Sequence, residues 1–324
     1  MSRAYLERFA THPITDGERM VATVMMPAVL ISDFPGKQYP TPDEHLEIVG
    51  SFDVRGHEVL VSRMGALAVR PPAHLSDPYA GQDPFPGDLP EKIAFEAEAA
   101  ELFNLVQCEL ALRSRIVTLP SAPLVLARGR LLEGHLGLVS GGGGYERTLG
   151  PFTGLWTHGM HAINPTTLSP AVLAAAAPLE WAQTLGGVSA TLPRFILAAY
   201  SSLDHHEHPE ALMTGWIVVE QLLDELWARH VAALDPKTRR DRLKDTRTYT
   251  AAVRAEVLLT AGHLEQPLYT QVQLARGHRN NLAHRAEVTE QHAVEVVKAM
   301  HAFLELRLGA TLPPVVVMGA GVSW

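Results

Sequence analysis

Residues Arg279-Asn280-Asn281-Leu282-Ala283-His284 lie inside Pro267 to Leu308, the stretch that decides the fold of the C-terminal half. Five of its positions are spaced four, three, four and three apart, as on the inward face of an amphipathic helix: Leu268, Val272, Ala275, Arg279 and Leu282. An arginine therefore occupies a position that is typically apolar. Because an unpaired buried guanidinium costs several kcal/mol, we expect Arg279 to face a carboxylate, a subunit interface or a ligand anion.

A turn separates this predicted helix from a second one. Asn280 and His284 are four residues apart and share one face of the first helix, and Arg276 extends that face by one turn. Residues 285–288 break the helical period, and Thr289 followed by Glu290 predicts a new helix start. The buried positions of the second helix are expected to be Ala293, Val296, Val297, Met300, Phe303 and Leu304.

Arg279, Asn280 and His284 match a signature in which an Arg and a polar residue precede a His near the junction of two helices. In this the chain resembles the HEPN superfamily (higher eukaryote and prokaryote nucleotide-binding domains), in particular its Apea-like branch. Two earlier helices of that family are matched by Pro193 to Leu203 and by Ala211 to Val231, which contains the acidic Glu220. The bare pattern recurs elsewhere in a chain with 16 His, so the helical context carries the resemblance, which covers only the C-terminal half.

The resemblance implies a metal-independent endoribonuclease that uses no cofactor and carries its site at a homodimer interface. In such chemistry the 2′-hydroxyl of RNA attacks the neighbouring phosphate. His284 would act as base or acid, Arg279 would stabilise charge on the phosphate, and Asn280 would orient the imidazole or bind a phosphate oxygen. Because the family is frequent in bacterial toxin and antiphage defence systems, the expected partners are RNA, such as tRNA or mRNA, and an antitoxin or trigger protein.

Glu220 and Arg276 are expected to support this site. Glu220 either pairs with Arg279 or Arg276 and directs the guanidinium, or is a partly exposed helix residue near a surface base. Alternatively, Arg279 and Glu220 form a buried strut, while Asn280 and His284 cap the end of the helix. The chain would then be a non-catalytic HEPN-like module for dimerisation or partner binding.

A basic cluster offers a candidate RNA-binding surface. The net charge of the chain is −8, but residues 194–307 hold 14 of the 27 Lys and Arg and only 15 of the 35 Asp and Glu. Within that range, Arg239, Arg240, Arg242 and Lys244 lie in a run from Lys237 to Arg254 that contains two acids. Such a cluster favours phosphate binding, although an ordinary solvated helix face would have the same composition.

The N-terminal half has strand-like and turn-like patterns. Strands are predicted at 47–52, 57–62, 66–70 and within 124–138, and one long helix at 91–116. The glycines at 141–144 lack a following Gly-Lys-Ser or Gly-Lys-Thr, so they indicate a loop and no phosphate site. We predict an α+β fold with three parts: a β-rich domain of unrecognised family at 1–165, which senses a trigger or selects RNA, an all-α HEPN-like bundle at 166–308, and an apolar tail at 309–324.

Several classes of protein are disfavoured by composition. Cys108 is the single cysteine, so no internal disulfide is possible and a reducing compartment is favoured. Met1 is not followed by an apolar signal segment, and the apolar run at 21–31 is too short to span a membrane. The consecutive His205-His206-Glu207-His208 cannot all converge on one metal ion. We therefore expect a cytoplasmic protein without a metal, and a C-terminal tail that adds a strand to the N-terminal sheet.

Overall fold

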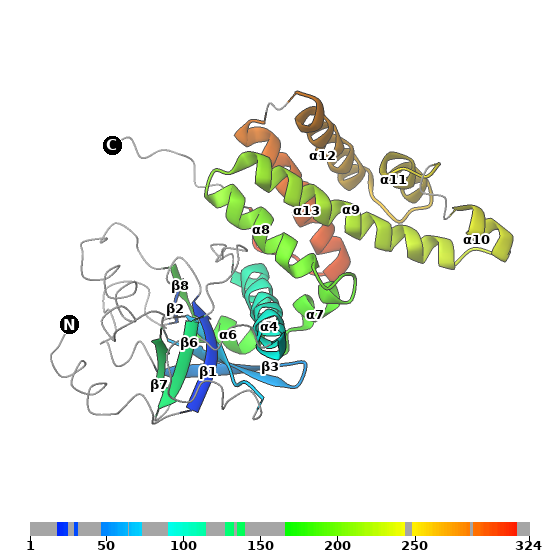
Figure 1. Ribbon diagram of the computed structural model, residues 1–324. Helices are drawn as coiled ribbons and strands as arrows, with labels where there is room; N and C mark the ends of the chain where they lie inside the picture. The colour runs from blue at the N-terminus through cyan, green and yellow to red at the C-terminus, as the bar shows by residue number, and fades with distance from the viewer. Residues whose placement is uncertain are drawn as a thin grey trace, which may run out of the picture. The chain divides into compact units, whose positions relative to one another are not determined.

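The computed structural model describes ten segments of the chain: residues 18–24, 29–31, 47–63, 65–72, 90–114, 127–132, 135–139, 166–243, 248–285 and 288–315. The fold is α+β, with strands in the N-terminal half and helices in the C-terminal half (Figure 1). Two compact units divide the chain. The first contains residues 1–110 and 122–179, and the second contains residues 111–121 and 180–324.

The first unit is built on an antiparallel sheet whose strand order is β3-β4-β5-β1-β6-β7. The bounds of these strands, in chain order, are β1 Glu18–Val24, β3 Ile48–Val54, β4 His57–Ser62, β5 Ala66–Val69, β6 Ala127–Leu132 and β7 His135–Val139. A separate parallel pair joins β2 Val29–Ile31 to β8 Thr166–Leu168. The strands expected at 47–52, 57–62, 66–70 and within 124–138 are confirmed, whereas β1, at the centre of the sheet, was not predicted.

The β3–β4 hairpin follows directly from its turn sequence. Arg55 and Gly56 both have positive φ, 53° and 81°, and this conformation matches the right-handed twist of the flanking strands. Asp53 closes the turn, since its carboxylate Oδ1 accepts the Gly56 N–H at 3.2 Å. Phe52 and Val54 are buried while Ser51 and Asp53 are exposed, as expected for a half-buried strand.

The long helix α4, Pro90–Ser114, agrees with the helix predicted at 91–116. Its first half packs beside the hairpin. The rings of His57 and Phe95 lie 6.2 Å apart, His57 Nε2 lies 3.4 Å from a Glu98 carboxylate oxygen, and Arg55 donates to Glu101 at 3.2 Å. The spacing of Ile93, Ala97, Ala100 and Phe103 predicts one apolar side for this helix, but Ala97 is exposed. The buried positions at this end are Phe95, Ala99 and Leu102, because the contacts with the sheet, which sequence periodicity cannot place, set the inward face.

The remaining helices follow one another with short connections. They are α6 Pro170–Ala176, α7 Glu180–Gly186, α8 Leu192–Asp204, α9 His208–Ala232, α10 Lys237–Leu243, α11 Ala251–Thr260, α12 Gln266–Arg285 and α13 Glu290–Leu308. The alanine-rich composition of 171–184 predicts a short helical linker, and two short helices, α6 and α7, occupy this region. Helix α11 was not predicted. Among the described helices, none is long and apolar enough to cross a membrane.

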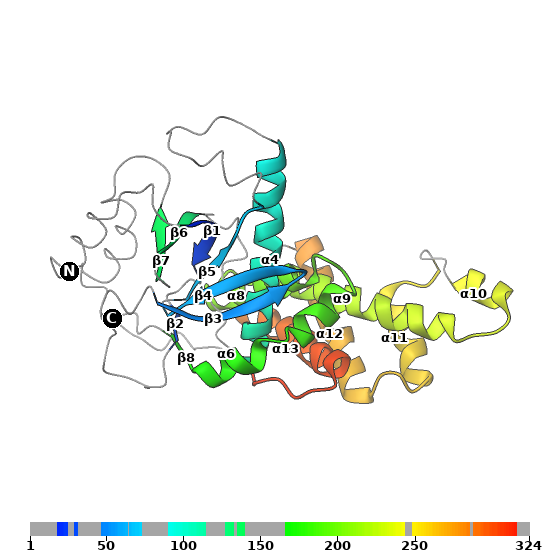
Figure 2. The same ribbon diagram turned by 90° about the horizontal axis from the view of Figure 1, so that it is seen from below.

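Helix α9 is the centre of the helical unit. It packs against α8, α11, α12 and α13, and α12 packs against α13 (Figures 1 and 2). In both views α10 lies at the end of α9 that is farther from α8. The predicted start of α13 is confirmed, because the Thr289 hydroxyl accepts the His292 N–H at 3.3 Å. All six positions expected on the inward face of α13 are buried.

Some expectations concern residues outside the described segments. These are the glycine loop at 141–144 and the tail from residue 316 onward, which includes most of the proposed added strand.

Two glycines of the helical unit give opposite predictions for stability. A Cβ at Gly215 of α9 would lie 3.2 Å from Val296 Cγ1 and 3.7 Å from Val297 Cγ2, whereas a Cβ at Gly277 of α12 would meet nothing within 4 Å. We predict that Gly215→Leu lowers the free energy of unfolding by about 2 kcal/mol through overpacking. Gly277→Ala should raise it by about 0.5 to 1 kcal/mol, because alanine favours a helix over glycine. Urea unfolding measures both, and a loss at Gly277 would contradict the packing described.

Candidate functional site

The three residues of the signature lie near the C-terminal end of α12. Arg279 and Asn280 are partly buried, and His284 is exposed. The guanidinium Nη1 of Arg279 donates to Asn280 Oδ1 at 3.1 Å. Asn280 and His284 are one helical turn apart, so this hydrogen bond draws the arginine toward the helix face that carries the histidine. A substrate can reach this face, because His284 is open to solvent.

Arg276 belongs to the same face, one turn before Asn280. Its Nε donates to Gln273 Oε1 at 3.1 Å, a contact within α12 itself. Arg276, Asn280 and His284 therefore form a row along the helix, with the Arg279 guanidinium joined to its middle member. An arginine side chain held by one neutral neighbour keeps donors available for a phosphate.

The expected pairing of Glu220 is not formed. Glu220 is partly buried on α9, but within the described segments no ion pair or hydrogen bond joins its carboxylate to Arg279 or Arg276. The prediction failed because sequence spacing cannot give the rotation of α9 about its axis relative to α12. Nor, among described residues, does Asn280 hydrogen bond to the His284 ring, so the orienting role expected of Asn280 is absent in this structure.

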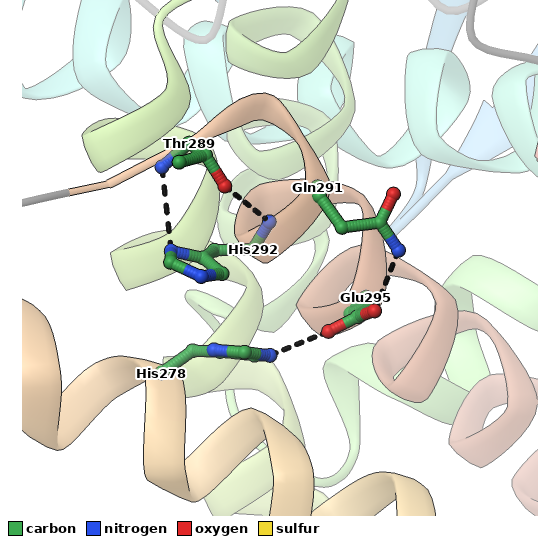
Figure 3. A network of polar contacts seen from close by, with 5 residues as sticks. All are labelled: His278, Thr289, Gln291, His292 and Glu295. Atoms are coloured by element: carbon green, nitrogen blue, oxygen red, sulfur yellow. Dashed lines mark hydrogen bonds and ion pairs between the residues drawn. The ribbon is translucent and has the colours of Figure 1, made fainter.

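A different pair joins α12 to α13. His278, directly before Arg279, places its Nε2 at 2.5 Å from Glu295 Oε2 of α13 (Figure 3). The exposed fractions of the two side chains are only 11% and 26%, so this contact is largely shielded from water. Such a charge-assisted hydrogen bond between helices is stronger than a surface pair, and breaking it would leave a partly buried group without its partner.

His292 completes this cluster from the first turn of α13. Its ring stacks on that of His278, with centroids 4.4 Å apart and planes inclined by 25°. Its Nδ1 accepts the Thr289 N–H at 3.3 Å, while the Thr289 hydroxyl accepts the His292 N–H (Figure 3). His292 thus occupies the position that Glu or Gln takes in a common capping box. Its ring also connects the start of α13 to the pair of His278 and Glu295.

Hydrogen bonding lowers the pKa of the Glu295 carboxyl group. The Gln291 amide, which donates to Oε1 at 2.5 Å, is the main cause, and His278 acts in the same direction, while burial partly opposes both. A carboxylate that accepts two such bonds is stabilised in its charged form. The ionised form of Glu295 is therefore the one that holds α12 and α13 together.

Sequence reasoning missed this cluster, although one signal was present. His292 stands three residues after the predicted N-cap Thr289, the position of a capping-box partner. The pair of His278 and Glu295 has a separation of 17 residues across a turn and gives no periodic signal. The polar link between α12 and α13 is supplied by His278, whereas Arg279 had been expected to face a carboxylate, a subunit interface or a ligand anion.

The basic cluster divides into exposed and buried members. On α10, Arg239 and Arg242 are exposed, and Arg240 Nη1 lies 3.6 Å from Asp235 Oδ1. Arg254 of α11 instead forms an ion pair with Asp224 of α9, and its side chain is only 11% exposed. Lys244, the fourth predicted RNA-binding residue, lies outside the described segments.

The His205–His208 run connects α8 to α9. His205 Nδ1 lies 2.8 Å from the Ser201 carbonyl oxygen, and His206 has a positive φ of 60° at the turn. Within the described part of the chain, no group of three or more His, Cys, Asp or Glu side chains is placed to hold a metal ion. These histidines shape a helix connection in the structure.

Substitution of Glu295 should destabilise the helical unit in a pH-dependent way. Because the folded carboxyl has a lowered pKa, its contribution is present at neutral pH and is lost as pH falls through the range where the carboxyl becomes protonated. Glu295→Gln should lower the free energy of unfolding by about 1.5 kcal/mol at neutral pH, with a smaller difference from wild type under acid conditions. Urea unfolding from pH 7 down to about pH 3.5 measures this.

Glu220→Gln is the matched control, since Glu220 is a partly buried glutamate of the same unit that makes no ion pair with described residues. Its effect should stay within about 0.5 kcal/mol at every pH. Equal losses at both positions would contradict the assignment of the interhelical contact to His278 and Glu295.

Comparison with family models, with curated proteins and with solved structures gives no match to the chain.

Proposed function

We propose that this protein is a HEPN-type, metal-independent endoribonuclease whose catalytic residues are Arg279, Asn280 and His284. The observation that carries the proposal is a division of roles between adjacent residues. His278 makes the polar contact that joins α12 to α13, whereas Arg279 has only the amide of Asn280 as its partner among described residues. His284 is exposed and has no partner in the same segments. These are properties of groups that act on a ligand.

The reaction that suits these residues is a transesterification within RNA, in which a new phosphate ester bond forms and another breaks. A histidine removes the proton from a 2′-hydroxyl, the 2′-oxygen bonds to phosphorus, and the bond to the 5′-oxygen breaks. The leaving oxygen takes a proton, so the products are a 2′,3′-cyclic phosphate and a 5′-hydroxyl. Arg279 and Arg276 would stabilise the charge that gathers on the phosphate oxygens.

A homodimer suits this reaction, because one histidine cannot readily donate and accept a proton in the same step. Two copies of α12 that face each other would supply His284 from each protomer, one as base and one as acid. We propose that the exposed arginines of α10 bind the RNA backbone and that the enzyme acts in the cytoplasm as a toxin or antiphage effector. The first unit would then select the RNA or sense the trigger.

The alternative is a non-catalytic dimerisation module. In that function Arg279 would be a strut paired with Glu220, but this pair is not formed in the structure. The contact between His278 and Glu295 already provides a strut at this junction. Ribonuclease activity is therefore the better supported proposal, and the two differ in whether any RNA is cut.

Cleavage of total cellular RNA and of purified tRNA in the presence of EDTA tests the proposal. We expect cut RNA with cyclic phosphate ends for the wild type. His284→Ala should lower the rate by about 10² to 10⁴-fold through loss of acid or base catalysis, and Arg279→Ala by about 10² to 10³-fold through loss of charge stabilisation. The pH profile of the rate should be bell-shaped, as two histidines in opposite roles require.

Arg194→Ala and His206→Asn serve as controls, because both residues are exposed and lie outside the site. Both controls should keep the wild-type rate. Intact RNA with wild-type protein, together with loss of thermal stability or dimerisation in His284→Ala and Arg279→Ala, would support the scaffold function instead.

A further inference from the structure

A pocket lies between α9, α10 and α11, away from the Arg279 row. Its volume is about 490 Å³, within the range of small-molecule sites. The lining residues are Asp224, Trp227, Ala228, Val231 and Ala232 of α9, Arg240 of α10 and Arg254 of α11. An apolar wall from one helix thus faces arginines from two others.

Trp227 holds the walls of the pocket in place. Its indole Nε1 donates to the Leu243 carbonyl oxygen at 3.2 Å, at the last residue of α10. Its ring also lies 5.4 Å from the ring of Tyr249, which precedes α11. One side chain of α9 thus contacts both of the segments that flank the pocket.

The two arginines of the pocket differ in availability. Arg254 is paired with Asp224 and nearly buried, so the charges of these two residues largely cancel. Arg240 lies 3.6 Å from Asp235, whose side chain is 94% exposed. An ion pair with so solvated a carboxylate is weak, and a phosphate can replace it. Arg240 is therefore the cation that a bound anion would reach.

Charge outside the pocket favours a ligand that carries an anionic group. Lys237, Arg239 and Arg242 lie on the exposed surface of the same short helix as Arg240. A ligand with an apolar flat part and a phosphate would place the flat part against Trp227 and Ala228 and the phosphate at Arg240. A simple inorganic anion would leave the apolar wall in contact with water.

We propose that this pocket binds one nucleoside phosphate, with the base on the α9 wall and the phosphate at Arg240. The nucleotide can be free or can be part of an RNA strand, and the chemistry recognised is the same. This pocket would add a nucleotide-binding site to the RNA contact proposed for α10. The inference rests on the proposed function only where the nucleotide belongs to an RNA strand. None of the pocket residues belongs to the proposed catalytic set.

Isothermal titration of the full-length His284→Ala protein in EDTA tests the inference without RNA cleavage. The probes are AMP, CMP, adenosine, inorganic phosphate and a short single-stranded RNA. We expect a mononucleotide to bind more tightly than either adenosine or phosphate. Adding Arg240→Gln should weaken binding by about tenfold or more, because a charge-assisted bond to the phosphate is lost. Adding Ala228→Leu should have a similar effect by filling the pocket.

Arg239→Gln is the matched control, since it removes the same charge from the adjacent, exposed position that does not line the pocket. It should change mononucleotide binding by about twofold at most. Binding of the RNA alone, with the same dependence on Arg240 and Ala228, would also support the pocket and identify an RNA nucleotide as its occupant.

Two results would overturn the inference. One is that no probe binds in a manner that depends on both Arg240 and Ala228, with the folded state of each variant verified by thermal unfolding. The other is that Arg239→Gln weakens mononucleotide binding as much as Arg240→Gln, which would indicate general attraction to a basic surface. Because the protein tested carries His284→Ala, both results are independent of whether the wild type cleaves RNA.

Discussion

The contact between His278 of α12 and Glu295 of α13 is the constraint on which the candidate site depends. It is short, largely shielded from water, and supported by Gln291 and by the stacked ring of His292. Successive residues of a helix point about 100° apart, so fixing the direction of His278 also fixes the direction in which Arg279 leaves the helix. The site is positioned by a residue that need not take part in the chemistry.

This arrangement assigns stability to His278 and reactivity to His284, which lie less than two helical turns apart. The partly buried His278 contributes to folding through its charged partner Glu295. The exposed His284 makes no hydrogen bond or ion pair with the described residues. Among the described residues, Arg279 is held only by the neutral amide of Asn280, which keeps its charge available to an anion. A site that must bind a polyanion and release it benefits from side chains whose native partners are weak.

Local patterns predicted much of the helical unit, including the N-cap at Thr289 and the buried positions of α13, because periodicity and capping depend on neighbouring residues. Of the two alternatives for Glu220, the pair with Arg279 or Arg276 is not formed, and spacing could not decide between them because it does not give the rotation of one helix against another. The pair of His278 and Glu295 was missed because it spans the turn between two helices and gives no periodic signal, and strand β1 was missed because strand pairing is not local. Their contacts join segments far apart in the sequence, such as β1 with β6.

We propose that the Arg279–Asn280–His284 face cleaves RNA and that the nucleophile is a 2′-hydroxyl of the RNA itself. The most direct measurement uses an RNA oligonucleotide cut by the wild-type protein and the same oligonucleotide with a single 2′-deoxy nucleotide on the 5′ side of the mapped cleavage position. With EDTA present in both reactions, we expect no cleavage at the deoxy position, while other sites in the same strand are still cut. Undiminished cleavage at the deoxy position would contradict this mechanism, because the proposed nucleophile is absent there.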